Sequence, residues 1–170
     1  MHNAGADTVE LVVQRHEGAL RAEKGVQAQV TALTVGGKRV ALAVPTTFMN
    51  ESGLAVRGLA KRFGITAPED IVIVHDELDL PTAALRVKAG GGLAGHNGLR
   101  SISSHLHSDD YMRVRIGVDK PVSKERGIDH VLRRFSKRER AEIDVTLEMA
   151  ADAVECIVTE GVDTAMNRFN

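Results

Sequence analysis

The feature that most constrains the fold is the apolar run Ile-Val-Ile-Val at 71–74, which is followed at once by His75, Asp76 and Glu77. A short, continuous apolar run is typical of a strand that is buried on both faces. The polar residues after it indicate where the strand stops. Such a strand needs covering layers on its sheet, so the run favours a domain that combines helices with strands.

Segments on either side of this run supply the other elements. Two alternating strands, 26–35 and 38–44, flank Gly36-Gly37, and adjacent glycines favour a tight hairpin because primed turns require positive φ. Alternation predicts further strands at 84–88 and 111–118, and apolar residues at helical spacing predict helices over 7–20, 56–64, 99–106 and 136–161. We therefore expect an α/β fold: a single domain over residues 1–170, with a mixed, twisted β-sheet flanked by helices.

The composition narrows the class of protein. Cys156 is the only cysteine, so an intramolecular disulfide is impossible and a secreted, disulfide-stabilised scaffold is excluded. No apolar run approaches the roughly 18 residues that a membrane helix needs, and residues 1–7 lack the basic and apolar regions of a signal peptide. We therefore expect a cytoplasmic protein with no membrane partner.

Charge is distributed unevenly along the chain. The formal net charge is -1, yet residues 85–138 carry 12 basic and 5 acidic side chains, a net of +7. This block has the sign needed to bind a polyanion, although it could also form solvated faces of helices and loops. With 3% aromatic residues and no Trp, the chain cannot build a base-stacking platform, so a nucleic acid would be recognised mainly by its backbone and shape.

Polar side chains follow the predicted strands in three clusters, at 46–50, 75–79 and 96–97. In open α/β sheets, ligands bind beyond the carboxyl ends of the strands. Asp76 has three interpretations here. With Glu77 and Asp79 it could bind a divalent cation, it could hold a histidine in the tautomer that makes a general base, or it could cap a helix or turn.

Two asparagines and a glycine-rich segment adjoin these clusters. The amides of Asn50 and Asn97 donate and accept at once, which suits recognition of a peptide bond, but each could equally be a turn or helix-cap residue. Residues 90–98 contain five glycines, which let a ligand approach the backbone, although a mobile surface loop has the same composition. The segment lacks the spacing of a nucleotide-binding P-loop or a dinucleotide fingerprint.

Four basic residues are expected to share one region of the fold. Arg86 and Lys88 lie on the strand that enters the glycine-rich segment, and Arg113 and Arg115 alternate on one face of strand 111–118. Contact with phosphate groups is the natural use of such a set.

Several of these segments together resemble the bacterial peptidyl-tRNA hydrolases. The motifs that carry the likeness are PTTFMNESG at 45–53, HDELDLP at 75–81, KAGGG at 88–92 and GHNGLRSI at 95–102, continued by RVRIG at 113–117 and AMNR at 165–168. Their order and spacing match as well as their letters. The likeness covers essentially the whole chain, and it implies that family's α/β fold.

The resemblance also implies a reaction and its catalytic pair. The family cleaves the ester that joins a peptide to the ribose of tRNA, and it uses no metal or cofactor. HNAG at 2–5 is similar to the family's histidine segment, with Met1 where an arginine usually stands. His2 would then be the general base, and Asp76 would be its orienting carboxylate.

The remaining site residues are assigned by the same resemblance. Asn50 and Asn97 would hold the peptide and the attacking water, and Met49 and His96 would line the cleft. The tRNA phosphates would be bound by Lys88 and Arg115, and also by Arg86 and Arg113.

Two departures from the family's pattern stand out. Asp119 replaces a usual glycine, which we interpret as a tolerated surface change. Family members begin with a strand and a G-L-G-N-P-G loop before the histidine, and the chain has neither, so we expect an N-terminally truncated member of the family. The run 71–74 would then keep an unpaired edge or an uncovered face, with a loss of stability.

Taken together, the sequence predicts a monomeric, metal-independent esterase that acts on peptidyl-tRNA and recycles its tRNA. The alternative is an RNA-binding module of the same fold that has lost catalysis. A third class, hydrolysis of a small ester or amide unrelated to RNA, fits the +7 block poorly, because a small neutral substrate needs no phosphate contacts.

Overall fold

Six strands form two three-stranded sheets in the computed structural model, which describes residues 3–93, 95–118 and 137–170. The first sheet is antiparallel, in the order β1 (Arg21–Glu23), β2 (Ala28–Val35) and β3 (Lys38–Pro45). The second is mixed: β6 (Met112–Gly117) lies between β4 (Val72–Glu77), to which it is parallel, and β5 (Leu85–Ala89), to which it is antiparallel. The expected mixed sheet is present, and the hairpin strands form a sheet of their own.

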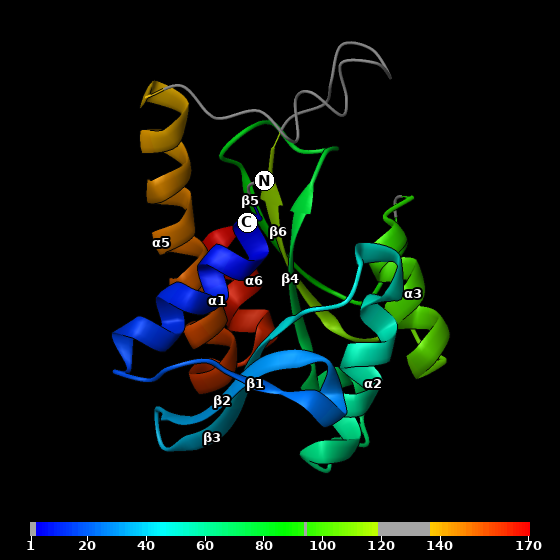
Figure 1. Cartoon of the computed structure of the whole chain (residues 1–170). Coiled ribbons are helices and arrows are strands. Elements are labelled where there is room, and N and C mark those ends of the chain that lie inside the picture. Colours follow the sequence, from blue (N-terminus) through cyan, green and yellow to red (C-terminus); the bar gives the residue numbers. More distant parts are fainter. Residues whose placement is uncertain (1–2, 94, 119–136) are drawn as a thin grey trace.

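Helices cover both faces of the mixed sheet (Figure 1). On one side lie α1 (Ala4–Arg15), α5 (Lys137–Glu160) and α6 (Val162–Phe169). On the other lie α2 (Ser52–Arg62) and α3 (Asn97–Leu106). Three 3-10 turns, η1 (Lys24–Val26), η2 (Met49–Glu51) and η3 (Pro68–Asp70), complete the described elements.

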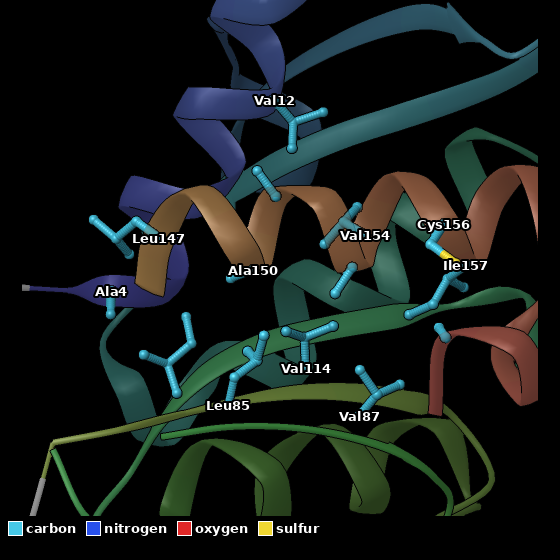
Figure 2. Packing of buried hydrophobic residues seen from close by; sticks show 14 of the residues in the cluster. Ala4, Val12, Leu85, Val87, Val114, Leu147, Ala150, Val154, Cys156 and Ile157 are labelled. Carbon is cyan, nitrogen blue, oxygen red and sulfur yellow. The ribbon is translucent and has the colours of Figure 1, made fainter. Parts of the chain in front are cut away.

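The two faces of the mixed sheet have different characters because strand residues alternate. Val74, Val114 and Val87 are in register across the three strands and pack in the main core with α1 and α5. Figure 2 shows the sheet residues Leu85, Val114 and Val87 facing α5. The opposite face carries Ile73, Arg113 and Lys88 in register, together with His75, Arg115 and Arg86. One face is therefore apolar and the other is largely charged.

The predicted hairpin is confirmed. β2 and β3 are paired from Val35↔Lys38 outward, and Gly36 and Gly37 have φ values of 55° and 80°. Both are positive, as a type I′ turn requires. The three-residue β1, which pairs with β2, was not predicted because its Arg-Ala-Glu sequence has no strand signal.

The C-terminal helices form the outer layer of the main core. Ile143 and Ala150 of α5 are fully buried, as the helical spacing predicts, and Ala153, which was not predicted, is also fully buried. Residue 136, where the helix was predicted to begin, lies outside the described residues. The chain turns at Gly161, with φ 94°, into α6, which was not predicted separately. Cys156 is buried between these two helices, beside the ion pair of Arg168 with Glu160.

β4 differs from its prediction in two ways. The strand does not halt at His75 but continues through Glu77. Both faces of the strand are covered as expected, because Val72 and Val74 pack against the main core and Ile73 packs against the cluster of α2 and α3, but these side chains are only half-buried. Among the described strands β4 is hydrogen-bonded to β6 alone, and a strand at the edge of a sheet is less covered than a central one.

Within the part of the chain that the structure describes, no helix is long and apolar enough to cross a bilayer.

Candidate active site

The polar clusters at 46–50, 75–79 and 96–97 meet beside the final residues of β4. A Cβ built on Gly98 would lie 2.8 Å from Met49 Sδ and 2.9 Å from His96, so η2 packs closely on the start of α3. The rings of His96 and His75 are in edge-to-face contact, with centroids 5.0 Å apart. The structure therefore brings Met49, His96 and the end of β4 together, as the sequence predicted.

Asp76 points to the opposite side of β4, toward the start of α1. Its Oδ1 accepts a hydrogen bond of 2.9 Å from the backbone N–H of Ala4. Burial raises the pKa of Asp76 to about 6, against the opposing effect of the amides of Ala4 and Gly5. Asp76 therefore accepts from the first N–H of α1, whose N-cap residue is Asn3. His2, two residues before Ala4, lies outside the described residues, so its contact with Asp76 stays a prediction.

Close packing makes the contact between Asp76 and α1 possible. Gly5 lies against the carbonyl group of Val74, and a Cβ at this position would collide with that carbonyl oxygen. The side-chain oxygen of Asn3 also accepts a hydrogen bond of 3.0 Å from Ala6 N. The chain just after His2 is thus fixed by a glycine contact, a helix cap and a carboxylate.

His75 lies at the candidate site but was not predicted as a site residue. Its ring is buried, and Nδ1 lies 2.9 Å from the backbone oxygen of Asp76. Because a carbonyl oxygen can only accept, Nδ1 carries the proton and Nε2 has a free lone pair. Burial lowers the pKa of His75 to about 4, and within the described residues Nε2 has no hydrogen-bond partner. A neutral imidazole therefore lies against the ring of His96.

His96 caps a helix with its ring nitrogen. Its Nδ1 accepts a hydrogen bond of 3.2 Å from Leu99 N and so caps α3. Burial also lowers its pKa, which favours a neutral ring. The cap fixes the beginning of the helix and therefore the position of Asn97, its first residue.

Several of the predicted site residues are exposed. Asn50 and Asn97 are exposed, as ligand-binding amides must be. Met49 is 55% exposed, and its neighbour Phe48 is 79% exposed. Phe48 was not predicted as a site residue, yet a large aromatic side chain that solvent reaches next to Met49 is a candidate contact for an apolar part of a ligand.

The four predicted phosphate-binding residues share one face of the mixed sheet but differ in exposure. Arg86 is exposed and Lys88 is half-buried. Arg115 donates to the buried carboxylate of Glu77 over 3.1 Å, and its side chain is 22% exposed. Arg113 is only 2% exposed, and this burial contradicts its predicted contact with phosphate, because a guanidinium enclosed by protein cannot reach a backbone in solvent.

The metal interpretation of the acidic cluster finds no support in the geometry. Alternation along β4 places Asp76 and Glu77 on opposite faces of the sheet. Within the described residues, no group of three His, Cys, Asp or Glu side chains is arranged to hold a metal ion.

Comparison with known proteins places the chain among related sequences and structures. The family model for peptidyl-tRNA hydrolase matches residues 1–170. The chain is 45% identical over 166 residues to the peptidyl-tRNA hydrolase of Mycolicibacterium vanbaalenii, which covers 98% of this chain and 86% of the relative. The corresponding protein of Rhodococcus erythropolis is 43% identical over 169 residues, with 99% and 88% covered. The crystal structure of peptidyl-tRNA hydrolase from Acinetobacter baumannii has a TM-score of 0.92 at 38% identity, with 99% and 85% covered.

Proposed function

The chain belongs to the peptidyl-tRNA hydrolase family, and we propose that it hydrolyses the ester bond between the peptide and the tRNA of a peptidyl-tRNA, which returns the tRNA to use. The observation that carries the proposal is the meeting of Met49, His96 and the end of β4, from three separate motifs, in a chain that the family model matches over residues 1–170.

The proposed reaction is general-base hydrolysis. The imidazole of His2 takes a proton from a water molecule, and the resulting hydroxide attacks the carbonyl carbon of the ester. The bond to the ribose oxygen then breaks, and the imidazolium returns the proton to that oxygen. Two observations support this scheme: the bond from Ala4 N to Asp76 fixes the chain beside His2, and a carboxylate with a pKa of about 6 is ionised at neutral pH, where it stabilises an adjacent imidazolium.

Substrate binding divides between the two ends of the ester. We assign the peptide and the attacking water to the exposed amides of Asn50 and Asn97, with Met49 and His96 lining the cleft. We assign the tRNA phosphates to Lys88, Arg86 and Arg115, which lie on the charged face of the mixed sheet. Arg115 already has a carboxylate partner in Glu77, so Lys88 is the leading candidate.

The setting of the reaction follows from its substrate. We propose a monomer in the cytoplasm, where translation produces peptidyl-tRNA. In the family's pattern a strand and a G-L-G-N-P-G loop precede the histidine segment. Such a strand would pair along the outer edge of β4, because β4 is hydrogen-bonded only to β6 among the described strands.

The decisive experiment measures release of free tRNA from a peptidyl-tRNA. We expect release by the chain in the presence of EDTA, and none above background by His2→Ala. Asp76→Asn should lose about two to four orders of magnitude in kcat, the usual effect of disabling a general base. Tight binding of the tRNA without release would instead favour the non-catalytic RNA-binding module, and near-normal turnover by Asp76→Asn would remove Asp76 from the mechanism.

A second experiment separates phosphate binding from chemistry. Lys88→Ala should raise KM for peptidyl-tRNA and leave kcat nearly unchanged, and it should reduce the slope of log KM against log salt by about 0.9, the value for one lost phosphate contact. Lys38→Ala, at an exposed position of the hairpin, is the matched control and should change neither quantity. A loss confined to kcat would place Lys88 in the chemical step.

A further inference from the structure

Arg113 occupies the centre of the mixed sheet, where a charged side chain needs an explanation. It lies in register between Ile73 of β4 and Lys88 of β5. With 2% of its surface exposed, it is the largest of the fully buried side chains. Its position was predicted from strand alternation, but its burial was not.

The guanidinium of Arg113 binds the backbone of the glycine segment, by which we mean residues 90–93. Nη1 donates to the carbonyl oxygen of Gly92, and Nη2 donates to that of Gly91 over 2.8 Å and to that of Asp109 over 3.4 Å. The planar group also lies over the ring of Tyr111, 4.7 Å from its centroid. Hydrogen bonds from a charged donor are stronger than neutral ones, and the planar guanidinium fixes the direction of each.

This arrangement is not one that core stability alone would favour. In the described part of the chain, Arg113 makes no ion pair with a carboxylate, and its Nε has no hydrogen-bond partner. Burying an unpaired charge is costly, and well-packed apolar residues often replace buried charges without loss of stability. The presence of an arginine at this buried position is therefore better explained by the backbone segment that it binds than by the stability of the core.

The glycine segment in turn supports Lys88. Gly91 has φ 105°, and a Cβ on it would lie 2.6 Å from Lys88 Nζ, so the ammonium group lies directly over this glycine. Three consecutive glycines have more conformational freedom than any other residues, and a chain of this kind keeps one shape only if other groups hold it. Arg113 is the side chain that holds its carbonyl oxygens inward.

We propose that Arg113 is a positioning residue that fixes the glycine segment so that Lys88 is presented to a substrate phosphate. The proposal rests on the proposed function of Lys88. This positioning role takes the place of the prediction that Arg113 itself contacts a phosphate.

The kinetic test uses Arg113→Lys, which keeps the charge but loses the planar pair of donors, and Arg113→Gln, which keeps an amide donor. In the full chain, both should raise KM for peptidyl-tRNA about tenfold, as expected for the loss of one charge-assisted contact. Both should leave kcat within about twofold and flatten the salt dependence as Lys88→Ala does. Arg113→Lys combined with Lys88→Ala should bind no more weakly than Lys88→Ala alone. Arg39→Lys, at an exposed position of β3, is the matched control.

Two kinetic outcomes would overturn the proposal. If Arg113 contacted phosphate directly, Arg113→Lys would keep the salt dependence, and its effect would add to that of Lys88→Ala. If Arg113 were merely structural, its variants would unfold more easily but would show unchanged KM and salt dependence while folded.

Amide hydrogen exchange tests the anchor without any substrate. Exchange at the amide of Gly90, which donates to the carbonyl oxygen of Tyr111 over 3.1 Å, should be at least about tenfold faster in Arg113→Lys and Arg113→Gln than in the wild-type protein. Exchange in α5 should not change in these variants, and exchange at Gly90 should not change in Lys88→Ala. Equal exchange in all proteins would refute the anchor itself. If exchange is faster in the Arg113 variants but Lys88→Ala has a normal KM, Arg113 does hold the glycine segment, but Lys88 does not bind the substrate. The proposal would then be overturned because the function assigned to Lys88 is wrong.

Discussion

His75 and Asp76 are adjacent groups whose pKa values are displaced in opposite directions, and substituting them tests the electrostatics of the site. Burial lowers the pKa of His75 from 6.5 to about 4 and raises that of Asp76 from 3.8 to about 6. Between about pH 4 and pH 6, folding therefore removes a proton from His75 and adds one to Asp76. In the wild-type protein these two contributions to the pH dependence of stability cancel.

The magnitude of each contribution follows from its displacement. One pKa unit is worth about 1.4 kcal/mol, so each group contributes about 3 kcal/mol across this range. For Asp76 the folded state binds the proton more tightly, so the free energy of unfolding falls as pH rises from 4 to 6. For His75 the unfolded state binds it more tightly, so the free energy of unfolding falls as pH drops from 6.5 to 4.

Each substitution removes one of the two contributions, so the difference from the wild-type protein measures the contribution of the substituted group. As the pH rises from 4 to 7, the free energy of unfolding of Asp76→Asn should increase by up to about 3 kcal/mol relative to that of the wild-type protein. The reason is that the amide still accepts from Ala4 N without carrying a buried charge. As the pH falls from 7 to 4, the free energy of unfolding of His75→Gln should increase by a similar amount relative to that of the wild-type protein. Urea unfolding of the wild-type protein, both variants and the double variant at half-unit steps of pH measures these differences. If the difference in the free energy of unfolding between the wild-type protein and a variant does not change with pH, the reasoning for the substituted group is refuted.

Three further substitutions test the packing, each by urea unfolding at pH 7. Gly5→Ala should destabilise the protein by roughly 1–3 kcal/mol, because the new methyl group collides with the Val74 carbonyl, and unchanged stability would show that α1 can shift away from β4. Tyr111→Phe should cost about 1 kcal/mol through the lost 2.9 Å bond with Ser103 Oγ, and a stabilising effect would contradict that bond. Ile143→Ala, at a fully buried position, should cost about 2–5 kcal/mol, and a cost below about 1 kcal/mol would mean that α5 packs more loosely than described.

Local sequence patterns predicted most of the fold. The glycine pair fixed the hairpin because positive φ is a local requirement, and the alternation at 111–118 correctly separated Val114 from Arg113. The patterns did not predict that the hairpin strands form a separate sheet. Which strands pair within one sheet is decided by long-range contacts, and these leave no periodic signal in the sequence of either strand.

The site was predicted less completely because burial is a tertiary property. Arg113 and Arg115 lie on the same face of β6 and carry the same charge, yet Arg113 is enclosed by the glycine segment and Arg115 binds Glu77. His75 was overlooked for the same reason: a histidine at a strand end gives no indication that its ring will contact a second histidine 21 residues later. Alternation from Ile73 would have placed both His75 and Glu77 on the charged face.

The burial of Cys156 between α5 and α6 equips the chain with a built-in reporter. The thiol is 4% exposed, and burial raises its pKa, so a thiol-specific reagent cannot reach or activate it in the closed state. Modification therefore requires the two helices to separate, and with only one cysteine in the chain every labelling event has the same origin. The labelling rate measures how often the C-terminal helices part, without any introduced probe.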